Sequence, residues 1–190
     1  MALPDVVVTD ADLVARVRRG EESVFEQIYR QHYAALCGYA LRWVRSHAVA
    51  EEVVQEVFLR IWWRRSEWTV GSTIAAYLYT AVRNGSLNRV RAERTGREWE
   101  ERTRAEVASL PVPPSAEPAD HALREQELAQ AIDDAVAQLA PRCRETFVLR
   151  RRHNLSYAEI AQVMGVSPKT VEVQIGLALK ALRKRLEAWL

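Results

Sequence analysis

The residues whose side chains are best suited to bind another molecule lie near the C-terminus, in the segment LSYAEIAQVMGVSPKTVEVQIGLALKALRKRL. Side chains that can reach base edges come first in its second half, and basic side chains suited to phosphates follow. The first group is Lys169, Thr170, Glu172 and Val173, and the second is Lys180, Arg183 and Lys184. Phosphate contacts position a protein on a duplex, whereas base-edge contacts read its sequence. This order of side chains therefore indicates binding to a nucleic acid.

Two short helices must position these side chains, and the local sequence marks their ends. Ser156 and Glu159 have the spacing of a capping box, and Gly165 permits the left-handed backbone that ends a helix. Ser167 is a good N-cap with Pro168 at the first helical position. Two helices that cross steeply also need a small residue, a turn glycine and an apolar anchor, here Ala161, Gly165 and Val171. The segment is predicted to form a helix-turn-helix, with a generic helical hairpin that has a solvated basic end as the alternative.

The rest of the chain also has the pattern of long helices. Seven Gly and seven Pro among 190 residues leave few breaks. Apolar residues at steps of three and four predict helices over 10–19, 23–43 and 46–61, and a further helix that starts at Ile74 after a break at Gly71. The predicted fold class is therefore all-α.

The net charge of +2 hides a strongly uneven distribution of charge. Three segments, 83–97, 142–152 and 169–185, each hold five basic residues and one acidic residue, a charge of +4. Segment 98–127 instead holds eight acidic and three basic residues, a charge of −5. Basic patches of this kind favour a polyanionic partner, and they argue against a pure interaction module that never touches DNA.

The segment SLPVPPSAEPAD contains four of the seven prolines and no helical period, which is typical of an extended linker. We therefore predict two small helical domains, at 1–96 and 123–190, joined by an acidic, Pro-rich linker at 97–122.

Residues for catalysis, metal binding or cofactor binding are not apparent. The four histidines form neither H-x-x-H nor H-E-x-x-H; they are His32, His47, His121 and His153. Cys37 and Cys143 exclude a disulfide scaffold and a four-cysteine zinc site, and both thiols are expected to be structural. We expect a protein that is not an enzyme and that uses no metal or cofactor.

The sequence contains no apolar run of about 18 residues, the length of a membrane span. The start, MALPDVVVTDADLV, has no basic flank before its short apolar stretch. Neither a signal peptide nor membrane insertion is expected, and the predicted location is cytoplasmic.

Two motifs resemble the conserved domains of extracytoplasmic-function (ECF) sigma factors, the smallest class of the sigma-70 family. AEEVVQEVFLRIW at 50–62, followed by YLYTAVRNGSLNRVR at 77–91, resembles domain two. LAPRCRETFVLRRRHNLSYAEIAQVMGVSPKTVEVQIGLALKALRKRL resembles domain four. The second motif alone also resembles LuxR-type regulators. Such a regulator would need an α/β domain before the helix-turn-helix, and residues 1–110 show no buried β runs.

The resemblance implies a transcription initiation factor that performs no catalysis. It would bind core RNA polymerase through the β′ coiled coil and the β flap, place it on the minus-ten and minus-thirty-five promoter elements, and help open the duplex. It also implies control by an anti-sigma factor. The acidic linker would thread the polymerase cleft along a basic channel, with a soluble tether as the alternative.

By the same resemblance, domain two supplies three groups of site residues. The docking surface for core polymerase is Gln55, Glu56, Leu59 and Arg60, for which a solvated polar face is the alternative. The loop that captures a flipped base of the minus-ten element offers Trp68, Thr69, Ser72 and Thr73, although Trp68 could instead plug the core. The following helix presents Arg83, Asn84, Asn88 and Arg91 to the same element.

Domain four would read the minus-thirty-five element with Ser167, Lys169, Thr170, Glu172, Val173 and Lys180. Two departures from the family are visible. Asn88 stands where an aspartate is common, so a hydrogen-bonding role survives there and a charge-based one does not. Gly176 and Leu177 stand where relatives often carry a polar or aromatic residue and an arginine, so fewer contacts are expected from that turn.

Overall fold

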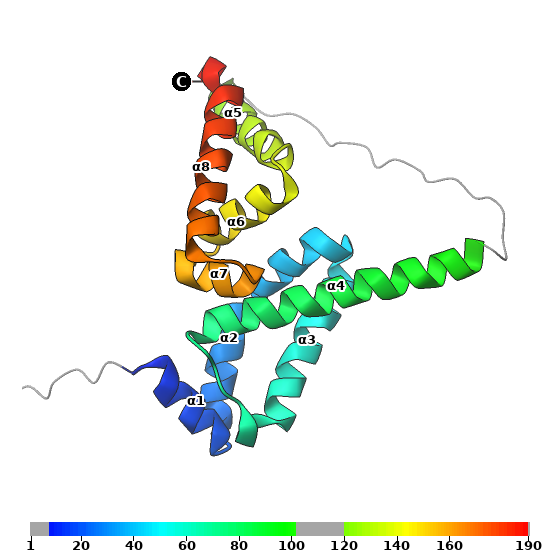
Figure 1. Cartoon of the computed structure of the whole chain (residues 1–190), viewed down its shortest axis with the longest axis vertical. Coiled ribbons are helices and arrows are strands. Elements are labelled where there is room, and N and C mark those ends of the chain that lie inside the picture. The colour runs from blue at the N-terminus through cyan, green and yellow to red at the C-terminus, as the bar shows by residue number, and fades with distance from the viewer. Residues whose placement is uncertain (1–7, 102–119, 190) are drawn as a thin grey trace, which may run out of the picture. The chain divides into compact units, whose positions relative to one another are not determined.

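The computed structural model describes residues 8–101 and 120–189 (Figure 1). Every regular element in this part of the chain is a helix, which confirms the predicted all-α class. The chain divides into two compact units, an N-terminal unit that ends near residue 100 and a C-terminal unit formed by the helices after residue 119. Each unit is described by itself.

Between residues 8 and 101, the N-terminal unit contains four α-helices and one short 3-10 helix. They are α1 (Asp10–Arg18), α2 (Glu22–Val44), α3 (His47–Trp63), η1 (Arg65–Glu67) and α4 (Ile74–Glu101). The predicted helices at 10–19, 23–43 and 46–61 are confirmed to within two residues at each end. The predicted cap is also present, because the Ser46 hydroxyl accepts a hydrogen bond from the Val49 amide at 3.5 Å.

The core of this unit forms where α2, α3 and α4 meet. Leu36, Val54 and Val82 are among its fully buried side chains. The Tyr39 and Tyr79 rings pack edge to face with centroids 5.2 Å apart and join α2 to α4. On the other side of α4, a Cβ added at Gly85 would lie 3.1 Å from Val53 Cγ1 of α3, so the glycine allows a close approach of these two helices.

Helix α1 holds the connection between α3 and α4 in place. The Ile74 amide, at the first position of α4, donates to Asp10 Oδ2 at 2.6 Å. Arg18 Nε donates to the Ser66 carbonyl in η1 at 3.1 Å. These two bonds fasten both sides of the loop at 68–73, which belongs to the segment 65–73 predicted to capture a base, so α1 acts as a brace for that loop.

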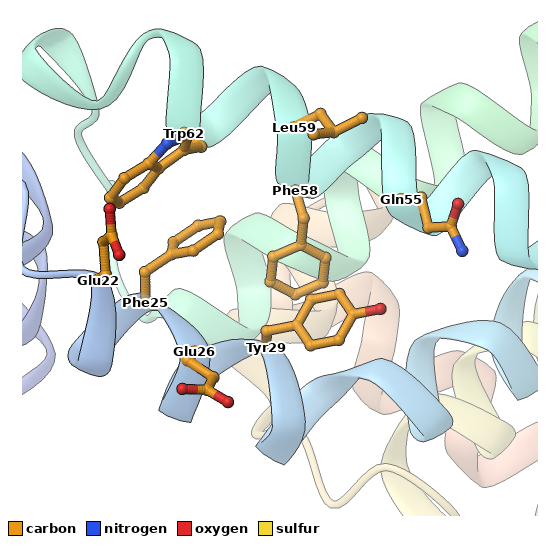
Figure 2. A pocket seen from close by; sticks show the side chains of 8 residues that line it. All are labelled: Glu22, Phe25, Glu26, Tyr29, Gln55, Phe58, Leu59 and Trp62. Atoms are coloured by element: carbon orange, nitrogen blue, oxygen red, sulfur yellow. The ribbon is translucent and has the colours of Figure 1, made fainter.

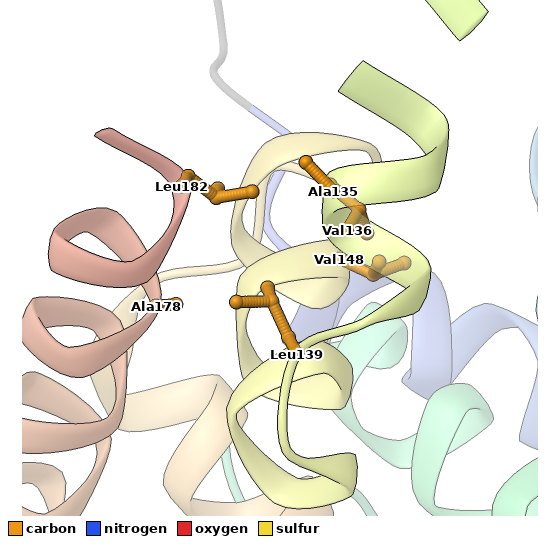
Figure 3. Packing of buried hydrophobic residues seen from close by; sticks show 6 residues of the cluster. All are labelled: Ala135, Val136, Leu139, Val148, Ala178 and Leu182. Carbon is orange, nitrogen blue, oxygen red and sulfur yellow. The ribbon is translucent and has the colours of Figure 1, made fainter. Parts of the chain in front are cut away.

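The C-terminal unit contains α5 (Asp120–Ala137), α6 (Pro141–Arg151), α7 (Tyr157–Met164), α8 (Pro168–Arg185) and η2 (Glu187–Trp189). Its hydrophobic cluster draws side chains from α5, α6, α8 and the turn after α5 (Figure 3): Ala135, Val136, Leu139, Val148, Ala178 and Leu182. A buried hydrogen bond, from the Thr146 hydroxyl to Gln174 Oε1 at 2.6 Å, links α6 to α8. This packing determines which face of α8 remains exposed to solvent.

Both predicted caps of the helix-turn-helix are present. The Ser156 amide donates to Glu159 Oε2 at 2.7 Å, and the Glu159 amide donates to the Ser156 hydroxyl at 3.3 Å. Gly165 has a φ of +64°, the left-handed conformation predicted for the turn. The predicted helix-turn-helix is therefore confirmed in its local geometry.

Replacement of Ser156 by alanine should loosen α7. Loss of an N-cap costs about 1 kcal/mol of helix stability, which corresponds to roughly fivefold faster exchange of the α7 amides. Hydrogen exchange of the full chain, followed by mass spectrometry, measures this. Ser23→Ala on the exposed side of α2 is the control and should leave α7 unchanged. Equal exchange of α7 in wild type and Ser156→Ala would contradict the role of the cap.

The domain boundaries at 96 and 123 stay predictions. α4 continues to Glu101 and α5 begins at Asp120, so both helices extend into the predicted linker at 97–122. The remainder of that linker lies outside the described residues.

Candidate nucleic-acid and protein-binding surfaces

Helix α8 has one face packed in the unit and one face open. Its buried residues are Val171, Gln174, Ile175, Ala178 and Leu182. The opposite positions recur at steps of three and four along about three turns and are all exposed: Lys169, Glu172, Val173, Gly176, Leu177 and Lys180. We call these six residues the outer face of α8. An exposed, regularly spaced face on the second helix of a helix-turn-helix is the geometry that enters a major groove.

The first turn of α8 uses two of the predicted contact residues for its own cap. The Ser167 hydroxyl accepts from the Thr170 amide at 3.1 Å, and the two hydroxyls lie 2.9 Å apart in a second hydrogen bond. Lys169 Nζ pairs with Glu172 Oε2 at 2.9 Å. Of the predicted set, Lys169, Glu172, Val173 and Lys180 lie on the outer face, whereas Ser167 and Thr170 begin the helix.

The basic segment 142–152 is engaged largely in holding the C-terminal unit together. Arg144 Nη1 donates to the Ala137 carbonyl at 2.8 Å, and Arg150 Nη1 donates to the Leu155 carbonyl at 3.0 Å. Arg152 forms an ion pair with Asp133. These bonds join α6 to its neighbours, so the charge of this segment has a structural use that sequence alone did not reveal.

Helix α4 also presents an outward face. Asn84, Asn88 and Arg91 are exposed at steps of four and three, and Arg91 Nη1 donates to Asn88 Oδ1 at 3.3 Å. Arg89 lies on the side turned toward α3, where it pairs with Glu52 at 2.6 Å. The structure thus brings three of the four predicted α4 residues together as one polar face.

Arg83, the fourth predicted residue of α4, does not belong to this face. It is half-buried, and its guanidinium lies 5.6 Å from the centre of the Trp43 ring, a cation–π contact between α4 and α2. Its side chain therefore contributes to packing beside the polar face.

Trp68 lies in the core of the N-terminal unit and does not offer its ring to a base. Only 5% of it is exposed, and its ring centroid lies 6.0 Å from that of Tyr77. The alternative of a core plug describes this position better than a stacking surface, because the ring is covered. Thr69 and Ser72 remain exposed, whereas the Thr73 hydroxyl accepts from the Ala76 amide at 3.1 Å at the start of α4.

A pocket of about 530 Å³ opens between α2 and α3 (Figure 2). Four rings lie between the two helices: Phe25 and Tyr29 come from α2, and Phe58 and Trp62 come from α3. Phe25 and Trp62 have centroids 4.9 Å apart, as do Tyr29 and Phe58. The remaining lining residues are Glu22, Glu26, Gln55 and Leu59. The result is an apolar floor with a carboxylate-bearing rim on α2.

Two of the four residues predicted to bind the polymerase line this pocket. Gln55 and Leu59 do so, and Leu59 keeps 50% of its surface exposed. Glu56 and Arg60 are exposed on α3 outside the pocket. The rings of α2 are not among the predicted residues, although a signal exists in the sequence. Phe25 and Tyr29 lie four residues apart, the spacing of neighbours on one helix face.

The two cysteines occupy separate, half-buried positions. Burial raises the pKa of the Cys37 thiol, against the effect of a hydrogen bond with Tyr33. Cys143 packs against the hydrophobic cluster of the C-terminal unit. Because thiolates are the reactive form, burial keeps Cys37 in its less reactive state.

Metal-holding clusters and membrane-spanning helices are absent from the part of the chain that the structure describes. No three His, Cys, Asp or Glu side chains there are grouped so that they could hold a metal ion. Nor does any helix of residues 8–101 and 120–189 combine the length and the apolar character that crossing a bilayer requires.

Comparison with known proteins matches both units. Residues 28–95 match the family model for sigma-70 region 2, and residues 129–182 match the model for sigma-70 region 4. The chain is 31% identical over 181 residues to the ECF RNA polymerase sigma factor SigK of Mycobacterium ulcerans, covering 93% of this chain and 92% of that protein.

Two solved structures share the fold. CnrH in complex with the cytosolic domain of CnrY has a TM-score of 0.63 and 24% identity, over 94% of this chain and 97% of that one. The sigma factor RpoE of Bartonella quintana, in complex with the anti-sigma factor NepR, has a TM-score of 0.59 and 23% identity, over 86% of this chain and 96% of that one.

Proposed function

This chain belongs to the ECF class of the sigma-70 family of RNA polymerase sigma factors, and we propose that it directs core polymerase to promoters through three separate surfaces. The observation that carries the proposal is the outer face of α8, an exposed helix face within a capped helix-turn-helix. The other two surfaces are the pocket between α2 and α3 and the polar face of α4.

The pocket between α2 and α3 is the proposed docking site for core polymerase. Apolar pockets rimmed by polar groups are typical of the centre of a protein interface, where a few anchoring side chains supply most of the affinity. The half-exposed Leu59 and the Phe25 and Trp62 rings provide such an anchor. Glu22 and Glu26 lie on the rim. Because Glu26 already pairs with Arg30, Glu22 is the carboxylate that favours a partner segment with a basic residue beside its apolar ones.

The polar face of α4 and the adjoining loop are the proposed contact with the minus-ten element. Asn84, Asn88 and Arg91 offer hydrogen bonds both to phosphates and to exposed base edges. Because Trp68 is buried, capture of a flipped base falls to the exposed Thr69 and Ser72. These are short hydrogen-bonding groups that suit a Watson–Crick edge.

An anti-sigma factor is the proposed regulator. Support comes from the fold shared with RpoE of Bartonella quintana, whose structure holds the anti-sigma factor NepR. A protein that covers the pocket between α2 and α3 would compete with core polymerase for the same apolar surface. Binding alone would then control the activity of this chain, with no covalent modification.

Run-off transcription tests the proposed function. Purified bacterial core polymerase is incubated with this chain and a library of genomic fragments, and core polymerase alone is the control. Discrete start sites that depend on the chain and share two upstream sequence blocks are the expected result. DNA binding without any binding to core polymerase would instead make the chain a stand-alone regulator.

The two lysines of the outer face should contribute to the salt dependence of promoter binding. Each phosphate contact releases counterions, and the slope of log K against log salt changes by about 0.9 per contact on duplex DNA. Lys169→Ala with Lys180→Ala should therefore flatten the slope by up to about 2. Titration of the holoenzyme onto promoter duplex at several salt concentrations measures this, and an unchanged slope would remove both lysines from the phosphate contacts.

A further inference from the structure

The outer face of α8 carries little net positive charge for a surface that meets DNA, since Glu172 offsets one of its two lysines. Between Pro168 and Leu179 the sequence holds a single basic residue, Lys169, and its ammonium pairs with Glu172 at 2.9 Å. Readout of guanine most often uses an arginine or lysine that reaches O6 and N7 together. The first three turns of this helix therefore offer little to a guanine.

These turns of α8 also offer little for the readout of adenine. Asparagine or glutamine commonly reads adenine through N6 and N7. The one such residue in these turns, Gln174, is buried, and its Oε1 accepts the hydrogen bond from the Thr146 hydroxyl at 2.6 Å. Its amide faces the inside of the unit, so the polar side chain best suited to adenine is committed to the core.

Apolar side chains occupy the centre of the outer face instead. Val173 is 52% exposed and Leu177 is 55% exposed, and they lie one turn apart. Lys169 lies before them and Lys180 after them on the same face. On a helix that enters a major groove, this apolar patch lies between two cations. Such a patch fits DNA that presents an apolar group on its base edges and anionic phosphates on either side. The apolar group that DNA presents in the major groove is the thymine 5-methyl.

Gly176, between these two side chains, has no explanation within the chain itself. Its backbone is ordinary helix, and an added Cβ would meet nothing within 4 Å. Glycine inside a helix is less stable than alanine, so neither conformation nor packing within the unit favours it. Absence of a side chain does help where a helix backbone must approach another molecule closely.

We propose that Val173 and Leu177 read thymine methyl groups of the minus-thirty-five element, and that Gly176 allows the α8 backbone to approach the base edges between them. This inference rests on the proposed function, since it assigns a sequence preference to the same helix. It also replaces the expectation that the turn at Gly176 and Leu177 makes few contacts. The element should contain T·A pairs spaced about one helical turn of α8 apart along the groove.

Removal of single methyl groups from the DNA tests this. A duplex library randomised upstream of the minus-ten block is first selected with holoenzyme made from the full chain and core polymerase. Each enriched thymine of the selected duplex is then replaced by uracil, which lacks only the 5-methyl. Wild-type holoenzyme should lose about fourfold in affinity at each contacted position, the value of one buried carbon group.

Matched variants assign each methyl to its side chain. Val173→Ala and Leu177→Ala should each abolish the effect of uracil at one position and leave it intact at the other. Leu179→Ala, an equally large exposed residue on the flank of the same helix, should respond to uracil as wild type does. Gly176→Ala should raise the urea midpoint of the full chain yet weaken binding to the selected duplex, opposite effects that a purely structural glycine would not produce.

Three outcomes would overturn the inference. The first is a selected element that holds no T·A pair. The second is a holoenzyme that accepts uracil at every position without loss of affinity. The third is full wild-type sensitivity to uracil in both Val173→Ala and Leu177→Ala. Absence of any enriched duplex would overturn the proposed function together with the inference, whereas enrichment without methyl dependence would overturn the inference alone.

Discussion

Leu59→Asp should reduce the affinity of this chain for core RNA polymerase by at least about thirtyfold. Central anchoring residues contribute about 2 kcal/mol or more to an interface, and thirtyfold corresponds to that energy. The substitution places a carboxylate above the apolar floor formed by Phe25 and Trp62, beside the acidic rim of α2. Docking would then require an unpaired charge to lose its water.

The experiment compares labelled wild-type and variant chains in an equilibrium titration with purified core polymerase. Because Leu59 is half-exposed, the variant should fold normally, and circular dichroism checks this. Trp63→Asp is the matched control on the same helix. Trp63 is more exposed, at 76%, yet it does not line the pocket, so its replacement should change affinity no more than about threefold, as is usual at an interface rim. Equal losses in both variants would show that exposed apolar area, and not the pocket, governs docking.

Asn84→Ala combined with Arg91→Ala should impair promoter opening by about ten- to 150-fold, while binding to closed duplex changes much less. Both side chains lie on the polar face of α4, and hydrogen bonds to charged groups are worth about 1.5–3 kcal/mol. Contacts with exposed bases exist only once the strands separate, so their loss acts mainly on opening. Permanganate reactivity of unpaired thymines near the start site measures opening, and a mobility assay at low temperature measures duplex binding.

Arg89→Ala provides the control for this double variant. It removes an arginine from the same helix, but one whose guanidinium pairs with Glu52 of α3 at 2.6 Å. Loss of an exposed ion pair costs at most about 1 kcal/mol of stability, and opening should remain normal. If Arg89→Ala slowed opening as much as the double variant, the polar face of α4 would have no special role.

The helix-turn-helix could be predicted because its signals are local. The Ser156 and Glu159 capping box, the left-handed Gly165 and the Ser167 cap each involve residues within a few positions of one another. Such contacts depend on backbone conformation and short hydrogen bonds, which neighbouring residue types determine directly. The periods of three and four that predict the helices of the N-terminal unit are local in the same sense.

The sequence by itself therefore determined the all-α class, the ends of the first three helices to within two residues, and the position of α8 as the second helix of the helix-turn-helix. Only the tertiary structure decided which side chains of those helices are available. Trp68 is covered in the core, Arg83 lies over the Trp43 ring, and Gln174 turns inward to Thr146. The pocket between α2 and α3 likewise exists only because Phe25 meets Trp62. In each case the partner comes from a different helix, so the outcome depends on packing between distant segments, which periodicity and capping along one helix do not specify.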